Sequence, residues 1–150
     1  MKKLLTTLSL MVAVLAVFAQ SEKQVKWSFT AKKIAADTYE VQMLAEVGGN
    51  YHIYAQEAGD GPLPTSFEFT KNPLISLNGK VKESGKQIKK YEEVFKSEVR
   101  YYEQKVAFTQ VVKIKGKAKT NLAGKVEFIV CNDRECLPPS TVNFKVPIGG

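Results

Sequence analysis

The chain has 150 residues, which is the size of one ordinary domain. Its 22 lysines and arginines exceed its 15 aspartates and glutamates, which gives a formal net charge of +7, and 44% of its residues are hydrophobic. These values exclude a collagen-like, a disordered or a multi-span membrane chain, and two cysteines with one histidine are too few for a four-ligand Cys/His zinc site.

Residues 1–19 have the layout of a cleavable secretory signal peptide. Two lysines precede an apolar run that ends at Phe18, and Ala19 supplies a small residue before the expected cleavage point. The run is shorter than the roughly 20 apolar residues that a membrane helix needs, so an uncleaved anchor is the less favoured alternative. We therefore expect residues 20–150 to be exported, to the periplasm or beyond the cell, without stable membrane insertion and in a compartment that permits disulfides.

The dominant hydrophobic period after the signal peptide is two, which predicts half-buried antiparallel strands. Apolar and polar residues alternate in six segments, at 24–31, 38–47, 66–69, 106–114, 125–130 and 141–146. Turn signals separate these runs, and they lie at 48–50, 59–62, 78–79 and 138–139. About seven to nine short strands in one domain predict an all-β fold, an immunoglobulin-like β-sandwich over residues 20–150.

Four lysines occupy alternate positions near the end of one predicted strand, at Lys113, Lys115, Lys117 and Lys119. On a strand they would line one face, and the favoured interpretation is a solvated face or a guarded edge strand. Binding to an anionic surface is the alternative. An exported chain without a nucleic-acid motif gives no reason to expect nucleic acid as a partner.

The cysteine pair is the most reactive feature of the chain, because only four residues separate Cys131 from Cys136. Cys131 follows a strong strand pattern, and Pro138 and Pro139 cannot donate to a sheet, so we expect the pair at a strand end or across a tight hairpin. A disulfide closing so short a loop stabilises a fold by about 2 kcal/mol, against about 4 kcal/mol for a loop of around 65 residues. A short, exposed disulfide therefore fits an exchangeable bond better than a structural one.

Two other interpretations of the pair stay open. In the first, Cys131 and Cys136 form a structural disulfide in a non-enzymatic secreted β-sandwich that serves binding or assembly. In the second, His52 and a carboxylate complete a metal site, but the spacing is not that of a zinc finger, so we expect no metal. Reducibility separates the first interpretation from exchange, because a structural disulfide resists a glutathione-like potential whereas an exchangeable one is readily reduced.

The segment 126–146, which contains both cysteines and the Leu-Pro-Pro that follows, resembles the active-site region of the N-terminal periplasmic domain of the thiol:disulfide interchange protein DsbD. The resemblance covers most of residues 25–147. Three further stretches agree with this family, namely the start of the first strand at 27–29, an aromatic strand at 51–54 and a segment with the family's cap loop at 91–99.

This resemblance implies an immunoglobulin-like fold whose cysteine pair cycles between dithiol and disulfide. It implies that Cys136 forms the mixed disulfide with a thioredoxin-like partner and that Cys131 resolves it. It also implies that an aromatic residue of the cap loop shields the pair until a partner docks. Phe95 is the best match for that residue, and Val94 replaces it if the register shifts by one.

The family also sets the expected partners and cofactors. Electrons pass from one thioredoxin-like protein to another, and because the dithiol is itself the redox group we expect no metal, nucleotide or flavin. The membrane-spanning and C-terminal domains of DsbD have no counterpart in this sequence, so we expect a separate electron donor. The best-known members of the family have a longer gap between the two cysteines.

The remaining candidates are supporting residues near the pair. Glu93, together with Glu92, is expected to set local acidity or to transfer protons, with a solvated loop charge as the alternative. Tyr54 is expected to be a supporting contact on the aromatic strand. His52 is expected to be a surface or hydrogen-bonded residue rather than a catalytic base.

Overall fold

The computed structural model describes residues 23–150, so the predicted signal peptide at 1–19 lies outside the described residues. Within the described part, no helix is long and apolar enough to cross a membrane. The strands follow one another in chain order as β1 (Val25–Lys33), β2 (Thr38–Val47), β3 (His52–Tyr54), β4 (Ser66–Phe69), β5 (Ile75–Glu92), β6 (Ser97–Ile114), β7 (Thr120–Phe128), β8 (Val130–Cys131) and β9 (Ser140–Ile148).

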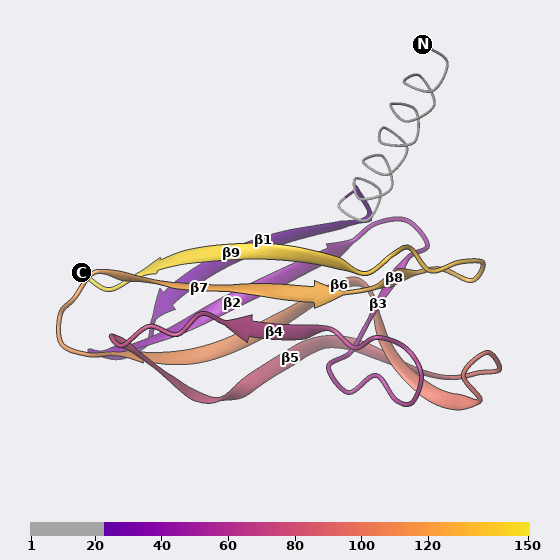
Figure 1. The fold of residues 1–150 in the computed structure, drawn as a ribbon, viewed down its shortest axis with the longest axis horizontal. Helices are drawn as coiled ribbons and strands as arrows, with labels where there is room; N and C mark the ends of the chain where they lie inside the picture. The colour runs from indigo at the N-terminus through magenta and orange to yellow at the C-terminus, as the bar shows by residue number, and fades with distance from the viewer. Residues whose placement is uncertain (1–22) are drawn as a thin grey trace, which may run out of the picture.

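The strands form two antiparallel sheets that pack face to face, so strands of the two sheets overlap in the view of Figure 1. The larger sheet has the order β1-β2-β6-β3-β8, and β5 pairs with β6 as well. The smaller sheet has the order β4-β7-β9. The chain is therefore a β-sandwich, as the period of two predicts.

The core lies between the two sheets and consists of the inward residues of the alternating segments. Phe108 of β6 and Phe128 of β7 are fully buried, and the Trp27 ring of β1 lies 5.9 and 5.4 Å from their ring centroids. Burying each of these large rings is worth on the order of 2–3 kcal/mol. The packed sheets thus form a rigid support for whatever projects from their ends.

The hairpin of β5 and β6 is longer than the sandwich and extends past it (Figure 1). The sequence predicts only the second half of β6 as a strand, and it predicts a turn at Asn78-Gly79. In the structure Asn78 and Gly79 instead lie in β5, where the register with β6 shifts, and Gly79 takes a φ of 74°. The turn signal therefore marks a bulge inside a strand, because glycine permits the left-handed backbone that a bulge requires.

The lysines at the end of β6 also differ from the expected arrangement. The strand ends at Ile114, so only Lys113 is part of it, whereas Lys115, Lys117 and Lys119 lie in the connection to β7. Gly116 in this connection has a φ of 69°, which breaks the alternation that a shared face needs. All four lysines are exposed, which agrees with their interpretation as solvated charges.

A second, smaller hydrophobic cluster lies where the long hairpin leaves the sandwich. Its buried members are Tyr54, Ala58, Val99, Tyr101 and Cys131. Phe95, Ile88 and Ile129 pack against this cluster while remaining partly exposed. Cys131 is thus part of a small hydrophobic cluster that is separate from the main core.

Candidate functional site

The two cysteines face each other across a tight hairpin. Cys131 ends β8, and the chain turns back so that Cys136 forms an isolated antiparallel bridge with it. The Leu137 N–H donates to the Val130 carbonyl at 2.8 Å and closes the hairpin beside them. Cys131 and Cys136 thus form a non-hydrogen-bonded pair, which is the closer of the two kinds of residue pair in antiparallel strands. Their Cα atoms are 4.0 Å apart, and their sulfurs form a disulfide.

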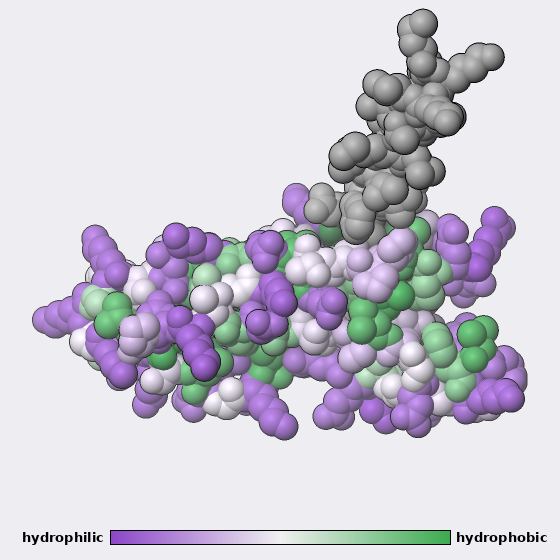
Figure 2. Space-filling view, in the orientation of Figure 1, coloured by the Kyte–Doolittle hydropathy of each residue, from purple (hydrophilic) through white to green (hydrophobic). Residues whose placement is uncertain are grey.

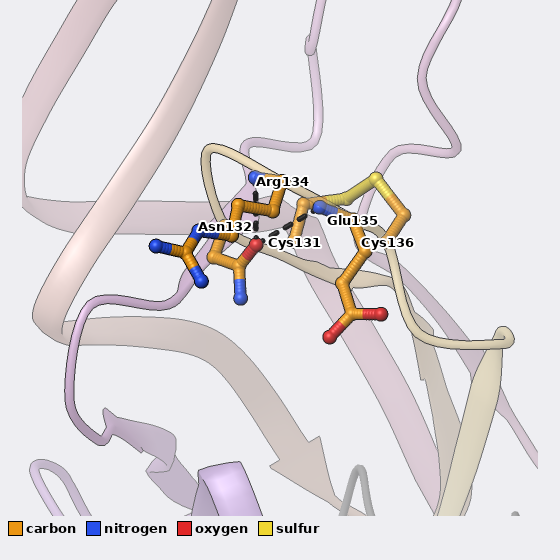
Figure 3. Close-up of a disulfide and its surroundings, with 5 residues drawn as sticks. All are labelled: Cys131, Asn132, Arg134, Glu135 and Cys136. Carbon is orange, nitrogen blue, oxygen red and sulfur yellow. Dashed lines mark hydrogen bonds between the residues drawn. A yellow bond between two sulfur atoms is a disulfide. The ribbon is translucent and has the colours of Figure 1, made fainter.

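The turn between the cysteines is held by a side chain of its own. The Asn132 Oδ1 accepts hydrogen bonds from the backbone N–H groups of Arg134 and Glu135 at 2.8 and 2.9 Å (Figure 3). The Asn132 N–H in turn donates to the Glu135 carbonyl at 2.9 Å. Asparagine forms such turns readily because its side chain replaces a backbone acceptor. A gap of four residues is therefore enough to place the two cysteines opposite each other.

The two cysteines differ sharply in exposure. Cys131 is only 1% exposed, since its side chain lies in the small hydrophobic cluster. Cys136 is exposed on the returning chain, where the ribbon leads out toward the two prolines. A sulfur atom approaching from solvent therefore meets Cys136 first, and Cys131 is shielded from it.

His52 occupies the position next to Cys131 in the sheet. In the register of the strands His52 is directly opposite Cys131 of β8 on one side and Glu103 of β6 on the other. Directly opposite residues project from the same face of a sheet, with Cβ atoms about 4.5–5.5 Å apart. A single row thus runs across the strands from Glu103 through His52 and Cys131 to Cys136.

Two tyrosines flank this row on the same face of the sheet, two residues along the strands. Tyr54 of β3 is paired with Tyr101 of β6, and both are buried. The His52 ring lies 4.3 Å from the Tyr101 ring and 5.2 Å from the Tyr54 ring, measured between centroids. The imidazole is therefore held between aromatic rings, and His52 as a whole is only 8% exposed.

The row opens into a hollow of about 540 Å³. His52, Tyr54 and both cysteines line it, together with the turn residues 132–135 on one side. On the other side it is lined by residues of the β5–β6 hairpin, which are Lys90, Glu92, Val94 and Phe95. The tip of the long hairpin is thus brought against a disulfide that is distant from it in sequence.

Phe95 and Val94 are adjacent in the hairpin tip but have different environments. Phe95 is partly buried, its ring centroid lies 6.5 Å from that of Tyr54, and it packs against the cluster that contains Cys131. Val94 is 85% exposed, and Figure 2 shows a hydrophobic patch on the lobe where Figure 1 places this tip. Gly61, with a φ of 120°, lies so close to the Phe95 ring that a Cβ there would overlap it. Phe95 is therefore seated between the tip and the segment around Gly61.

The segment that precedes β4 holds the hairpin next to its tip. The Arg100 N–H donates to the Ala58 carbonyl at 2.8 Å, and the Ala55 N–H donates to the Arg100 carbonyl at 2.9 Å. The Ser97 hydroxyl donates to the Asp60 carbonyl at 2.5 Å. These bonds extend the pairing beyond the strands, so the tip is placed by backbone contacts rather than by side chains alone.

The charged residues over the hollow come from the hairpin and from the disulfide turn. The Lys90 Nζ lies 3.1 Å from a Glu92 oxygen and 3.9 Å from an Asp133 oxygen. Such exposed ion pairs contribute about 0–1 kcal/mol, so they set the local charge more than the stability. Glu92 faces the hollow, whereas Glu93 is exposed on the tip and does not line it.

Burial changes the protonation of two side chains in the hollow. It lowers the pKa of His52 below the usual 6.5, although the negative charges of Glu103, Glu92 and Asp133 partly oppose this shift. It raises the pKa of Tyr54 to about 12, with Glu92 adding to the effect. At neutral pH, His52 is therefore an uncharged imidazole and Tyr54 a neutral phenol.

The structure brings together most of the residues that the sequence singles out. Cys131, Cys136, Phe95, Val94 and Tyr54 all line one hollow, and Glu93 does not. Sequence reasoning missed the neighbours that other strands supply, which are Lys90, Tyr101 and Glu103. Tyr101 and Glu103 alternate along one strand, but nothing in the sequence says that this strand lies beside His52.

No group of three or more His, Cys, Asp or Glu side chains is arranged to hold a metal ion between residues 23 and 150. The chemical groups of the hollow are thus a disulfide with one accessible sulfur, a neutral imidazole and a few solvated charges. This set suits thiol–disulfide exchange, since that reaction needs only an accessible sulfur and a thiolate partner.

Comparison with known proteins points to one family. Residues 18–148 match the family model described as "Thiol:disulfide interchange protein DsbD, N-terminal". No curated protein has a sequence that matches this chain significantly.

Two solved structures share the fold. The N-terminal domain of DsbD from Neisseria meningitidis, in its reduced form, superposes with a TM-score of 0.58 at 18% identity and covers 86% of this chain and 89% of that one. The N-terminal periplasmic domain of ScsB from Proteus mirabilis gives a TM-score of 0.59 at 13% identity, over 84% of this chain. The match spans only 46% of the ScsB domain. At such identities the structures establish the fold, and they confirm the predicted immunoglobulin-like β-sandwich.

Proposed function

The chain belongs to the family of DsbD N-terminal domains, and from that premise we propose that it is an exported protein that exchanges disulfides with thioredoxin-like partners through Cys131 and Cys136. The cysteine pair cycles between dithiol and disulfide and carries two electrons from one partner to another. The periplasm is the compartment that suits this role, because it permits disulfides to persist.

The observation that carries this proposal is the unequal exposure of the two cysteines. A thiolate must attack one sulfur of a disulfide along the sulfur–sulfur bond, and only Cys136 is open to such an approach. A buried disulfide with no accessible sulfur, which is the usual form of a structural bond, lacks this opening. The exposure therefore favours exchange over a purely structural role.

The exchange follows from these positions. A donor thiolate attacks the Cys136 sulfur, the bond to Cys131 breaks, and the electron pair leaves on the Cys131 sulfur. A second donor thiol then releases Cys136, which leaves the donor oxidised and the pair reduced. In the opposite half of the cycle the Cys136 thiolate attacks an acceptor disulfide, and Cys131 displaces the acceptor by restoring the bond to Cys136.

Phe95 is the residue that we assign to the cap, with Tyr54 as its support. The Phe95 ring packs against the cluster that holds Cys131, and its neighbour Gly61 leaves room for it there. A cap at this place covers the Cys131 side of the disulfide and narrows the directions from which a small thiol reaches Cys136, while a docking partner displaces it.

Replacing Phe95 with alanine is expected to increase the rate at which dithiothreitol reduces the disulfide by about tenfold. The ring contacts that hold the cap are worth about 1 kcal/mol or more, and about 1.4 kcal/mol corresponds to a factor of ten. Val94→Ala is the matched control, since Val94 lies in the same turn but is 85% exposed. The rate is measured by quenching with an alkylating reagent and counting free thiols by mass. Equal acceleration in the two variants, or none in Phe95→Ala, contradicts the assignment.

The reduction potential of the Cys131–Cys136 couple tests the proposed function directly. We expect a value of roughly −180 to −270 mV, the range of thiol–disulfide exchange proteins. The protein, without its signal peptide, is equilibrated in defined thiol/disulfide buffers, alkylated and analysed by mass. A potential below about −300 mV would instead identify a structural disulfide, and the alternative of a secreted binding module would replace exchange.

A further inference from the structure

The row of side chains beside the disulfide contains an imidazole whose role is open. His52 is 8% exposed and lines the hollow, yet no hydrogen bond joins either of its ring nitrogens to another described residue. The ring nitrogens are not among the fully buried polar atoms that lack a partner in the described residues, so they stay accessible from the hollow and can accept a proton. Its neighbours in the register are Cys131 on one side and Glu103 on the other.

We propose that His52 accepts the proton of the Cys131 thiol when Cys131 resolves the mixed disulfide, and that the negative charge of Glu103 stabilises the resulting imidazolium. The proposal rests on the exchange function proposed above and assigns a base to one of its steps. The order carboxylate, imidazole and thiol across neighbouring strands is the arrangement by which a base activates a sulfur nucleophile.

The need for a base follows from the burial of Cys131. A thiol in a hydrophobic cluster resists ionisation, because burial disfavours the charged thiolate, and only the thiolate attacks a disulfide. Cys136 needs no such help, since it is exposed to solvent and can lose its proton to water. The lowered pKa of His52 keeps the imidazole uncharged at neutral pH and therefore able to accept a proton.

The step balances as follows. His52 takes the proton from the Cys131 sulfur, and the resulting thiolate attacks the Cys136 sulfur of the mixed disulfide. The bond between Cys136 and the partner breaks, and the electron pair leaves on the partner's sulfur, which takes up a proton. Over the whole exchange, from dithiol to disulfide, the cysteine pair is oxidised by two electrons and the partner disulfide is reduced by two.

Other charged and titratable groups also face His52 and modulate its basicity. Glu103, Glu92 and Asp133 favour its protonated form, while Lys90 disfavours it. The rings in contact with it are Tyr54 of the same strand and Tyr101 of β6. Among the carboxylates, the negative charge of Glu103 has the largest effect on His52, as expected for its cross-strand neighbour.

The resolving step can be isolated with an aromatic disulfide, 5,5′-dithiobis(2-nitrobenzoate). The reduced protein releases one nitrothiobenzoate when Cys136 attacks and a second when Cys131 displaces the group from Cys136, so stopped-flow absorbance separates the two phases. Cys131→Ser identifies the phases, because it releases only the first equivalent. Failure of the wild type to release the second equivalent would contradict the exchange function itself, not the role of His52.

In the wild type, we expect the second phase to slow as the pH falls through the pKa of His52, below 6.5, and to be independent of pH above it. In His52→Gln the rate of the second phase falls on the order of 100-fold at pH 7. Because hydroxide must then remove the proton, this rate increases about tenfold for each unit by which the pH is raised. His52→Phe, which keeps the ring contact with Tyr101, behaves in the same way. The first phase changes less than twofold in both variants.

Glu103→Gln tests the contribution of the Glu103 charge. Removing the negative charge of Glu103 lowers the pKa of His52 further, so the rate of the second phase begins to fall only at a lower pH than in the wild type. Glu127→Gln is the matched control, because Glu127 is an exposed carboxylate of the other sheet. A second phase in His52→Gln and His52→Phe with the wild-type rate and pH profile would overturn the proposal, as would equal slowing of both phases.

Discussion

Replacing Cys136 with alanine is expected to abolish the capture of thioredoxin-like partners, whereas Cys131→Ala should make the captured complex persist. Cys136 is exposed and attacks or is attacked, while Cys131 is 1% exposed and acts only within the molecule. Without Cys131, no internal thiolate can displace the partner from Cys136. The complex is measured on non-reducing gels after mixing each reduced variant with an oxidised thioredoxin-like protein.

A second measurement compares the two remaining thiols without any partner. In Cys136→Ala the buried Cys131 is expected to react with iodoacetamide on the order of 100-fold more slowly than Cys136 does in Cys131→Ala. The hydrophobic cluster around Cys131 must open before its thiol can react, and an opening free energy of about 3 kcal/mol gives a factor of this size. Each variant loses only the stabilisation that a short disulfide provides, about 2 kcal/mol, so we expect both to remain folded. Circular dichroism checks this expectation. Equal capture or equal alkylation would refute the assignment of roles.

Gly59→Ala is expected to destabilise the protein by about 2–5 kcal/mol and to uncover the disulfide. Gly59 has a φ of 98°, and a Cβ there would overlap the backbone carbonyl oxygen of Glu98. The left-handed backbone costs an alanine about 1–2 kcal/mol, and overpacking adds about 1–3 kcal/mol because a backbone atom cannot turn aside. The segment that contains Gly59 and Gly61 must then move away from β6. Phe95 thereby loses the contact with Gly61 that holds its ring in place.

Gly79→Ala provides the matched control for this prediction. Gly79 has a φ of 74°, but nothing lies within 4 Å of the position that its Cβ would occupy. Gly79→Ala should therefore lower the free energy of unfolding by only about 1–2 kcal/mol, through backbone strain, and leave the cap over the disulfide in place. Urea unfolding followed by the fluorescence of Trp27, the only tryptophan of the chain, gives both free energies. Equal losses, or unchanged reduction by dithiothreitol in Gly59→Ala, would show that the close approach does not hold the cap.

The long hairpin shows why part of the fold escapes sequence analysis. Residues 75–92 form one strand of 18 residues, yet they contain many lysines, serines and glycines and show no alternation. Most of their side chains are exposed, because β5 pairs only with β6 and its outer half extends beyond the sandwich. A strand with two solvated faces leaves no hydrophobic period, so only its partner β6 is recognised, and only in the half at 106–114 where buried and less buried residues alternate.

The residues of the cap illustrate the same limit at the level of one position. The sequence cannot choose between Phe95 and Val94, or between Glu92 and Glu93, because neighbours in a turn differ only by how the turn is oriented. In the structure Phe95 packs against the cluster of Cys131, whereas Val94 faces solvent. The surrounding chain at Gly61, distant in sequence, determines which residue is enclosed.

By itself, the amino-acid sequence determines the all-β class, most of the core strands and the chemistry of the cysteine pair. These depend on local properties, since the alternation of side chains is fixed by the backbone of each strand and the hairpin by a four-residue gap with an asparagine. The tertiary structure alone decides which sulfur is exposed and that His52 lies between Glu103 and Cys131. Such neighbours depend on the register between distant strands, which loop lengths and bulges set and no local pattern records.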